Sequence, residues 1–266
     1  MYVACGINLE QTSLFVQSEI TAHQEMDVLL QSFAYMGELE RMTQFKDKAK
    51  KQVEGIRSSL FTYPVLMAGD ILLYDAEFVP VGDDQKQHLE LTRTIAERVN
   101  HQYGEFFTVP KPLFPELTAR VMSLQNPEQK MSKSDPNIKS KILLSDPENI
   151  IKKRIRSAVT DSEGTIRYDP ENKKGLSNLL RIYAALEETS VDVLVERYKD
   201  ANYQTFKDDL GTKIAAHLAP IQERYHALME SQELSNILDE GKKHAEQLAI
   251  KKVQRFKKKL GLGFKR

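Results

Sequence analysis

The chain has 266 residues, of which 41% are hydrophobic and 29% charged, with 38 basic and 38 acidic side chains. This length suits one large domain or two ordinary ones, the composition is that of a soluble globular protein, and the zero net charge limits any nucleic-acid contact to local patches. The single cysteine excludes a disulfide framework and a Cys-rich zinc site, which suits a reducing compartment. No apolar run is long enough to cross a membrane, and the first residues do not form a signal peptide.

The first fifth of the chain predicts a short strand followed by helices. Residues 14–16 are apolar and predict a buried strand. Apolar residues then recur at helical spacing and predict an amphipathic helix over about 22–36, ended by Gly37. We interpret His23, at the start of that helix, as a cap or surface residue rather than a ligand. Residues 38–44 predict a short charged helix, and the lysine-rich residues 46–51 predict an exposed loop, with phosphate contact as the alternative.

Residues 63–74 form the most apolar stretch and predict a buried helix, with Pro64 in its first turn. Asp70 is a carboxylate inside this stretch, and a buried carboxylate is costly unless it is paired or hydrogen-bonded. Two interpretations stay open: Asp70 is satisfied by an arginine or a backbone N–H, or it is a fixed acceptor aimed into a pocket. Met67 and Tyr63, on the same helical face, would line that pocket.

A strand, a glycine turn and a helix follow one another over residues 78–99. The predicted strand covers 78–81, the turn contains Gly82, and the helix has an apolar face that includes the core-facing His88. This order is typical of the crevice end of an open α/β sheet, where ligands bind.

The rest of the chain changes character near residue 137. Residues 104–118 are interpreted as a connecting segment and 120–124 as a short strand. Residues 145–148 have the form of a capping box that opens a basic helix, and only helical periods occur from Leu176 onward. We therefore predict an α/β domain over 1–137 and an all-helical domain over 138–266.

One loop carries the clearest chemical signal: Lys130, Met131, Ser132, Lys133 and Ser134. The next three residues, Asp-Pro-Asn, favour a turn. Two ammonium groups on a loop suit a polyphosphate whose charge must be held while a bond breaks. The alternative is a solvated basic loop.

The string at 130–134 matches the KMSKS signature of class I aminoacyl-tRNA synthetases. Together with residues 67–74, 79–88, 124–137 and 157–164, it makes the chain resemble the bacterial-type tryptophanyl-tRNA synthetases over essentially its whole length. The resemblance implies a cytoplasmic ligase that activates tryptophan with ATP to tryptophanyl-adenylate and transfers it to tRNA(Trp). It also implies a homodimer, with an interface around residues 38–44 and 67–74, and neither membrane nor DNA as a partner. The implied fold is a partial Rossmann-type parallel sheet with flanking helices, followed by a helical anticodon-binding domain.

The resemblance also assigns site residues. Asp70 would accept the indole N–H of tryptophan, Met67 and Val81 would line the ring, and Tyr63 and Gln85 would lie near the α-amino group. The residues implied for ATP are Gly82, Asp83 and Asp84 on the ribose side, Val121 beside the adenine, and Lys130, Met131, Ser132, Lys133 and Ser134 over the phosphates. Lys130 and Lys133 would be catalytic, and Lys46 and Lys48 would be further phosphate contacts. Mg²⁺ would be held mainly by the phosphates, without a protein metal site.

One family feature is absent from the sequence. Class I synthetases carry a second signature, a His-x-Gly-His type turn after the first strand, and no such turn occurs here. We therefore expect the chain to lack an N-terminal part of the family pattern, to expose a strand edge, and to be weak or inactive alone. The competing hypotheses are a non-catalytic tRNA-binding or dimerisation module derived from a synthetase, and a tyrosine-specific member of the family.

Overall fold

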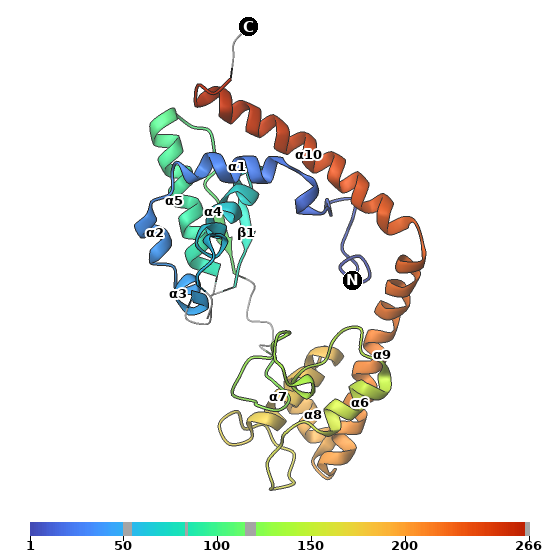
Figure 1. Ribbon diagram of the computed structural model, residues 1–266. Coiled ribbons are helices and arrows are strands. Elements are labelled where there is room, and N and C mark those ends of the chain that lie inside the picture. The colour runs from blue at the N-terminus through green and yellow to red at the C-terminus, as the bar shows by residue number, and fades with distance from the viewer. Residues whose placement is uncertain (50–54, 83–84, 115–120, 264–266) are drawn as a thin grey trace. The chain divides into compact units, whose positions relative to one another are not determined.

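The computed structural model describes residues 1–49, 55–82, 85–114 and 121–263, without the side chain of Lys48. The predictions for Lys48, Asp83 and Asp84 therefore lie outside the described part. The chain forms two compact units (Figure 1). The helical unit consists of Met1–Ile7 and Leu117–Gln232, and the sheet unit consists of Asn8–Glu116 and Glu233–Arg266.

The sheet unit is built on a two-stranded parallel sheet and the helices around it. Strand β1 (Phe78–Pro80) pairs with β2 (Lys111–Leu113), with Val79 opposite Pro112. Helix α4 (Ser58–Leu72) packs against both α1 (Ala22–Gln31) and α5 (Lys86–Tyr103), and α10 (Glu233–Lys259) runs along α1 (Figure 1). The short elements are η1 (Gln17–Glu19), α2 (Met36–Glu40) and α3 (Thr43–Ala49). The apolar faces of α1, α4, α5 and α10 meet in one core that includes Met26, Leu30, Val65, Leu72, Ile95 and Phe256.

The strand–turn–helix prediction for residues 78–99 is confirmed. Strand β1 is followed by α5, and His88 in the first turn of α5 is fully buried, as are the apolar residues predicted for its inner face. The α/β fold class is confirmed as well. The segment 104–118 is more than a connection, because it contains β2, whose three residues were too few to predict a strand.

Several local predictions for the first third are wrong. Residues 14–16 form no strand, because their backbone lies against α10: a Cβ on Gly241 would come within 2.0 Å of the Leu14 carbonyl oxygen. The helix predicted over 22–36 ends at Gln31, and Gly37 lies inside α2. Of the exposed loop predicted over 46–51, residues 46–49 lie in helix α3 instead, and residues 50 and 51 lie outside the described part. Helix α4 begins at Ser58, so Pro64 lies inside it and not in its first turn.

The helical unit contains α6 (Glu148–Arg156), α7 (Lys174–Glu187), α8 (Val191–Tyr198) and α9 (Tyr203–Glu230), with the short η3 (Ile138–Ser140) before them. The helices predicted after Leu176 are confirmed, and the stripe through Leu176, Leu179, Leu180 and Tyr183 is buried. The capping box predicted at 145–148 is wrong. Pro147 is the N-cap without a side-chain bond, and the Asp146 carboxylate accepts from the Leu143 N–H and from Arg154 instead.

The compact units do not coincide with the predicted domains. Residues 121–137 lie in the helical unit, because Leu124 belongs to its core and its backbone bonds to Ser140 and Val159. Helix α10 lies in the sheet unit, where it packs on α1. A functional boundary at 137/138 stays a prediction.

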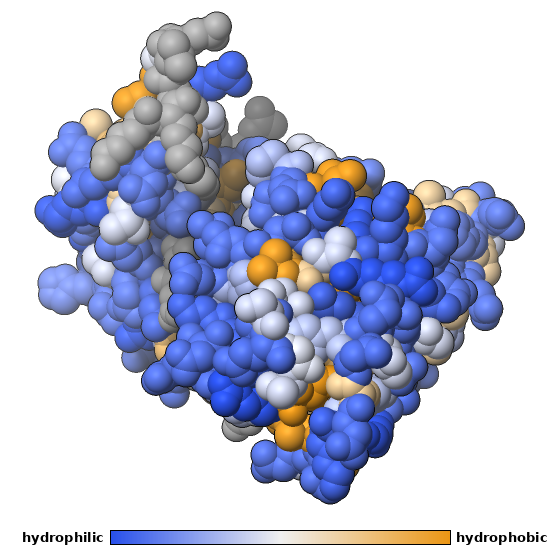
Figure 2. Space-filling view, turned by 90° about the horizontal axis from the view of Figure 1, so that it is seen from below, coloured by the Kyte–Doolittle hydropathy of each residue, from blue (hydrophilic) through white to orange (hydrophobic). Residues whose placement is uncertain are grey.

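The face of the protein in Figure 2 is largely hydrophilic, with isolated hydrophobic side chains.

Candidate active site

Asp70, in the last turn of α4, accepts hydrogen bonds from two other segments. Gln17, in η1, donates through Nε2 to both carboxylate oxygens at 2.8 Å. His23, in the first turn of α1, places Nδ1 2.7 Å from Oδ1. The side chain of Asp70 is 33% exposed and that of His23 only 3%. The partners are thus an amide and an imidazole, and not the arginine or backbone N–H of the first interpretation.

His23 is a buried link in a longer chain of polar contacts. Its Nε2 lies 2.9 Å from the Tyr74 hydroxyl, and its ring packs against Phe15 and Tyr74. Burial and the negative charge of Asp70 raise the pKa of Tyr74 to about 12, so this hydroxyl keeps its proton at neutral pH. The interpretation of His23 as a cap or surface residue is therefore wrong. Helix α1 packs on α4, and His23 in its first turn is buried against Asp70 of that helix.

A second polar chain joins two predicted site residues of the sheet unit, Tyr63 and Gln85, through His88. The Tyr63 hydroxyl lies 3.0 Å from His88 Nε2, and His88 Nδ1 lies 2.8 Å from Gln85 Oε1. Because an amide oxygen only accepts, His88 donates through Nδ1 and receives from Tyr63 at Nε2. The buried His88 therefore fixes Tyr63 of α4 relative to Gln85 at the start of α5.

The apolar side of this region is a small cluster separate from the main core. Val81, directly after β1, is buried with Ile71 and Leu89, and Met67 packs against them. Met67 thus lies near Val81, as the prediction of a common pocket requires, and Gly82 is exposed at the end of the strand segment.

The lysine loop of the helical unit projects from a tight hairpin. An isolated antiparallel bridge joins Met122 to Lys130, and the Met131 N–H donates to the Val121 carbonyl at 3.0 Å. Met131 packs against the helical core, whereas Ser132, Lys133 and Ser134 are exposed. The apolar Met131 therefore anchors the loop and leaves its polar residues in solvent.

Lys141 holds the far side of the same loop. The residue is 9% exposed, and its ammonium donates to the backbone carbonyls of Lys133, at 2.7 Å, and of Asp135. The ammonium groups of Lys130 and Lys133 form no hydrogen bond or ion pair with any residue that the structure describes. Two cations on a backbone fixed by a third can be directed to an anionic ligand.

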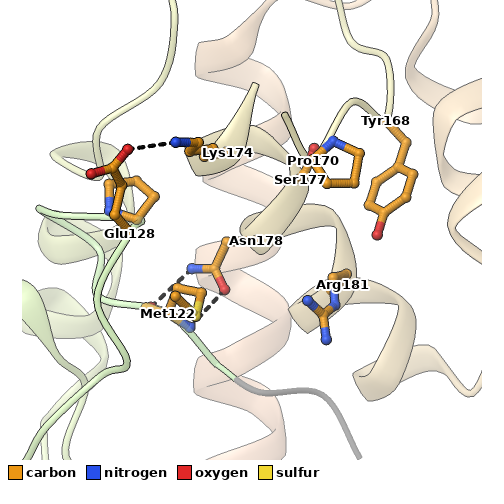
Figure 3. Close-up of a pocket in the computed structure, with 9 residues that line it drawn as sticks. Met122, Glu128, Tyr168, Pro170, Lys174, Ser177, Asn178 and Arg181 are labelled. Atoms are coloured by element: carbon orange, nitrogen blue, oxygen red, sulfur yellow. Dashed lines mark hydrogen bonds and ion pairs between the residues drawn. The ribbon is translucent and has the colours of Figure 1, made fainter. Parts of the chain in front are cut away.

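The hairpin is clamped to α7 by one side chain. Asn178 accepts from the Met122 N–H and donates to the Met122 carbonyl, both at 2.9 Å (Figure 3). Beside this clamp lies a cavity of about 340 Å³, also lined by Tyr168, Lys174 and Arg181. The clamp orients the segment that leads into the lysine loop, which forms one isolated bridge at Met122 and not the strand predicted over 120–124.

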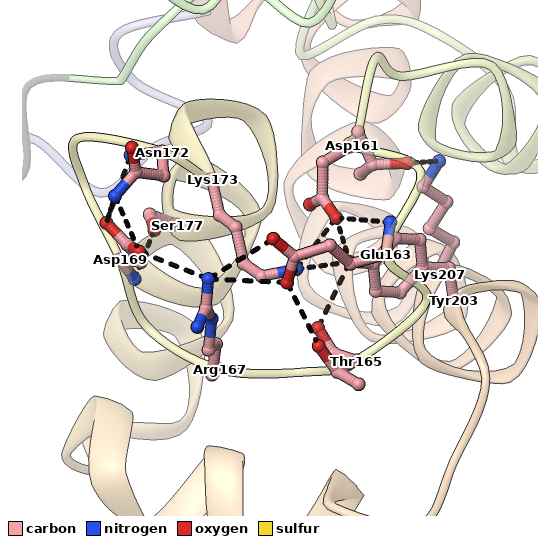
Figure 4. A network of polar contacts seen from close by, with 11 residues as sticks. Asp161, Glu163, Thr165, Arg167, Asp169, Asn172, Lys173, Ser177, Tyr203 and Lys207 are labelled. Carbon is pink, nitrogen blue, oxygen red and sulfur yellow. Dashed lines mark hydrogen bonds and ion pairs between the residues drawn. The ribbon is translucent and has the colours of Figure 1, made fainter.

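The 157–164 segment is held by a buried lysine (Figure 4). The side chain of Lys173 is 0% exposed, and its Nζ lies 2.7 Å from Asp161, 2.9 Å from Glu163 and 3.0 Å from the Tyr203 hydroxyl. Burial alone would raise the pKa of Asp161, but the hydrogen bonds from Lys173, Tyr203 and the Glu163 N–H outweigh it and lower the pKa to about 2. For Lys173, burial acts to lower the pKa and these partners raise it above its usual value. The segment is thus a structural clamp on the start of α7.

The residues of these arrangements that the sequence did not predict include Gln17, His23, Lys141 and Lys173. Each acts through contacts with other elements. A histidine two residues into a helix and lysines in polar segments carry no local signal of burial, so only paired positions in an alignment could have identified them.

Among the described residues, no group of three His, Cys, Asp or Glu side chains could hold a metal ion. Nor is any helix in the described ranges long and apolar enough to span a membrane.

The sequence matches the family described as tRNA synthetases class I (W and Y) over residues 1–219. The chain therefore belongs to the class I tRNA synthetases of the tryptophan and tyrosine group. It is 51% identical to the tryptophan–tRNA ligase of Bacillus subtilis (strain 168) over 266 residues, which are 100% of this chain and 80% of that protein.

Solved structures agree with this assignment. The tryptophanyl-tRNA synthetase of Campylobacter jejuni, crystallised with ADP and tryptophan, superposes with a TM-score of 0.85 at 36% identity, covering 98% of this chain and 80% of that one. The Mycoplasma pneumoniae enzyme gives 0.83 at 36% identity, with the same coverage. The tyrosyl-tRNA synthetase of Aeropyrum pernix, at 18% identity over 89% of this chain and 68% of that one, shares the fold with a TM-score of 0.58.

Proposed function

We propose that this chain carries the chemistry of a tryptophan–tRNA ligase: it activates tryptophan with ATP to tryptophanyl-adenylate and transfers the amino acid to tRNA(Trp). The observation that carries the proposal is the 51% identity to the B. subtilis ligase over the entire chain. The 36% identity to the tryptophanyl-tRNA synthetase of C. jejuni over nearly the whole chain supports tryptophan as the amino acid.

The residues of the sheet unit would recognise the amino acid. Asp70 accepts the indole N–H, and the apolar pair Met67 and Val81 lines the ring. Tyr63 and Gln85, fixed through His88, lie near the α-amino group. A site in which the bound ligand covers the acceptor rejects an analogue that cannot donate, because the acceptor is then left unpaired.

The residues of the helical unit would act on the phosphates. In the first half-reaction the carboxylate of tryptophan attacks the α-phosphate, and pyrophosphate leaves with increasing negative charge. Lys130 and Lys133 meet that charge with ammonium groups that no described residue already occupies, and Ser132, Ser134 and Met131 shape the loop around them. By the family resemblance, Val121 would lie beside the adenine, and Gly82, Asp83 and Asp84 would be on the ribose side.

Mg²⁺ fits this scheme as an ion held mainly by the ATP phosphates. Magnesium is bound with few protein carboxylates where a substrate supplies phosphate oxygens. When bound, it supplies further positive charge to the phosphates; the lysines orient the same groups from the protein side.

A cytoplasmic homodimer completes the proposal. Three large apolar side chains, Val28, Tyr35 and Met36, are 61–65% exposed on α1, on α2 and just before it. Exposed apolar side chains are typical of association surfaces, and Tyr35 and Met36 lie just before residues 38–44, one of the two segments predicted at the interface.

The test joins the 266 residues to the fifth of the B. subtilis ligase that they do not cover and measures ATP–pyrophosphate exchange. The chain alone is assayed in parallel, since the second class I signature is absent from its sequence. We expect exchange by the hybrid with tryptophan and none with tyrosine. A hybrid that is folded but exchanges only with tyrosine, or with neither, contradicts the proposed function.

A further inference from the structure

The orientation of the Asp70 carboxylate is not fixed by its own helix, α4. An acceptor that discriminates by one hydrogen bond needs a fixed oxygen, yet a 33% exposed aspartate at a helix end can adopt several rotamers. The donors that limit this freedom come from outside α4: His23 from α1 and Gln17 from η1.

The proton positions in this network follow from the chemistry of its members. An ionised carboxylate only accepts hydrogen bonds, so His23 Nδ1, at 2.7 Å from Asp70 Oδ1, carries a proton. In the neutral imidazole Nε2 is then the acceptor, and the Tyr74 hydroxyl at 2.9 Å donates to it. The chain runs in one direction, from Tyr74 through His23 to Asp70.

The two oxygens of Asp70 are not equivalent. Oδ1 accepts hydrogen bonds from both His23 and Gln17, whereas Oδ2 accepts one only from Gln17 among the residues that the structure describes. Because a carboxylate oxygen accepts about two hydrogen bonds, Oδ2 keeps one acceptor position. Partial exposure of the side chain leaves it within reach of a ligand.

The imidazole is itself held in place. Its ring centroid lies 5.9 Å from that of Phe15 and 5.6 Å from that of Tyr74. The backbone of α1 lies against Gly69 of α4, where a Cβ would be 3.6 Å from the His23 carbonyl oxygen. His23 is therefore a rigid donor, and Asp70 is the group that it orients.

We propose that His23 is a specificity-determining positioning residue: it holds Asp70 so that Oδ2 accepts the N–H of a bound indole. This inference rests on the proposed function. According to this inference, His23, which lies outside the predicted pocket, determines how well the chain discriminates tryptophan from an isostere without the N–H.

The test compares L-tryptophan with its benzothiophene isostere, in which sulfur replaces the indole N–H. Equilibrium dialysis with the full 266-residue chain gives the ratio of the two dissociation constants. Two variants form a matched pair, since the amide of His23→Asn reaches the position of Nδ1 and that of His23→Gln reaches the position of Nε2. Far-UV circular dichroism checks that both are folded.

We expect His23→Gln to lower the preference for tryptophan by about tenfold or more and His23→Asn to keep it within about threefold, since one neutral donor replaces another. Binding of the isostere should change little in either variant. If His23→Gln keeps the preference, or if both variants lose it equally, the positioning role is overturned.

Two further measurements separate this inference from the proposed function. If Asp70→Leu, which has a similar size but no acceptor, leaves the preference unchanged, the assignment of Asp70 as indole acceptor fails, and the proposed amino-acid site fails with it. If Asp70→Leu abolishes the preference and His23→Gln does not, only the role of His23 fails. Long-range ¹H–¹⁵N spectra of the free chain require no ligand: the Nδ1-protonated tautomer of His23 supports the inference, and the Nε2-protonated tautomer overturns it.

Discussion

Replacing Lys173 by methionine should destabilise the helical unit strongly. The substitution removes the cation that lies 2.7 Å from Asp161 and 2.9 Å from Glu163 while keeping an apolar side chain of similar length. The remaining carboxylate of Asp161 is 17% exposed, and its Oδ2 already has no hydrogen-bond partner among the described residues. The variant therefore leaves a largely buried negative charge with fewer donors.

The magnitude follows from two sources. The pKa of Asp161 falls from 3.8 to about 2, which corresponds to about 2.5 kcal/mol shared among Lys173, Tyr203 and the Glu163 N–H. Breaking a buried pair by removing one partner costs about 3–5 kcal/mol. We expect a loss of about 3 kcal/mol in the free energy of unfolding of the helical unit.

Urea unfolding followed by far-UV circular dichroism measures this loss. Lys174→Met is the matched control, since Lys174 is the next residue and pairs with Glu128 at the surface, where ion pairs contribute little. Asp161→Asn combined with Lys173→Met should recover part of the stability, because the double variant no longer buries an unpaired charge. A Lys173→Met variant no less stable than the Lys174→Met control would refute the reasoning.

The remaining predictions concern pH, packing and the two proposed binding sites. Because the pKa of Asp161 is lower in the folded state, its contribution is complete above about pH 4 and is lost as the pH falls toward 2; Lys173→Met should flatten the pH dependence of unfolding in that window. Gly175→Ala should destabilise the helical unit by several kcal/mol, because its Cβ would lie 2.0 Å from the Val159 carbonyl oxygen. Gly164→Ala meets no neighbouring atom and only the strain of a positive φ of 76°, so it should lose about 1 kcal/mol in the same urea titration. In the hybrid enzyme, Lys130→Ala and Lys133→Ala should each lower the exchange rate about 100-fold, while Lys139→Ala, exposed in the following turn, should retain it; equal rates in all three would contradict a phosphate role for the loop. Since the chain contains no tryptophan, the fluorescence of added L-tryptophan reports its binding directly, and Asp70→Ala should remove that signal change.

The features that could be predicted are those whose pattern lies within a short, contiguous stretch of the sequence. The stripe of α5 and the strand before it are local patterns, so both were found, and the lysine loop was found because its five letters and the turn after them are contiguous. The start of α4 was misplaced because residues 58–62 are not strongly apolar, and Pro64 is tolerated inside a helix that tertiary packing supports.

Features that depend on distant residues escaped prediction. His23 and Asp70 are 47 residues apart, and no periodicity in either helix indicates that their ends meet. Lys173 was missed for the same reason: a lysine is normally exposed, and its burial is explained only by Asp161, Glu163 and Tyr203 around it. Residues 14–16 are apolar and were therefore predicted to be a strand. In the structure the Leu14 backbone lies beside Gly241, 227 positions later, and pairs with no strand.

The measurement that tests the central claim most directly is tryptophan-dependent ATP–pyrophosphate exchange by the hybrid of this chain with the uncovered fifth of the B. subtilis ligase. The account predicts exchange that requires tryptophan, is not supported by tyrosine, and is lost in the Lys130→Ala, Lys133→Ala double variant. Absence of tryptophan-dependent exchange in a folded hybrid, with the intact B. subtilis ligase active alongside it, would contradict the claim that these residues form the active site of a tryptophan–tRNA ligase.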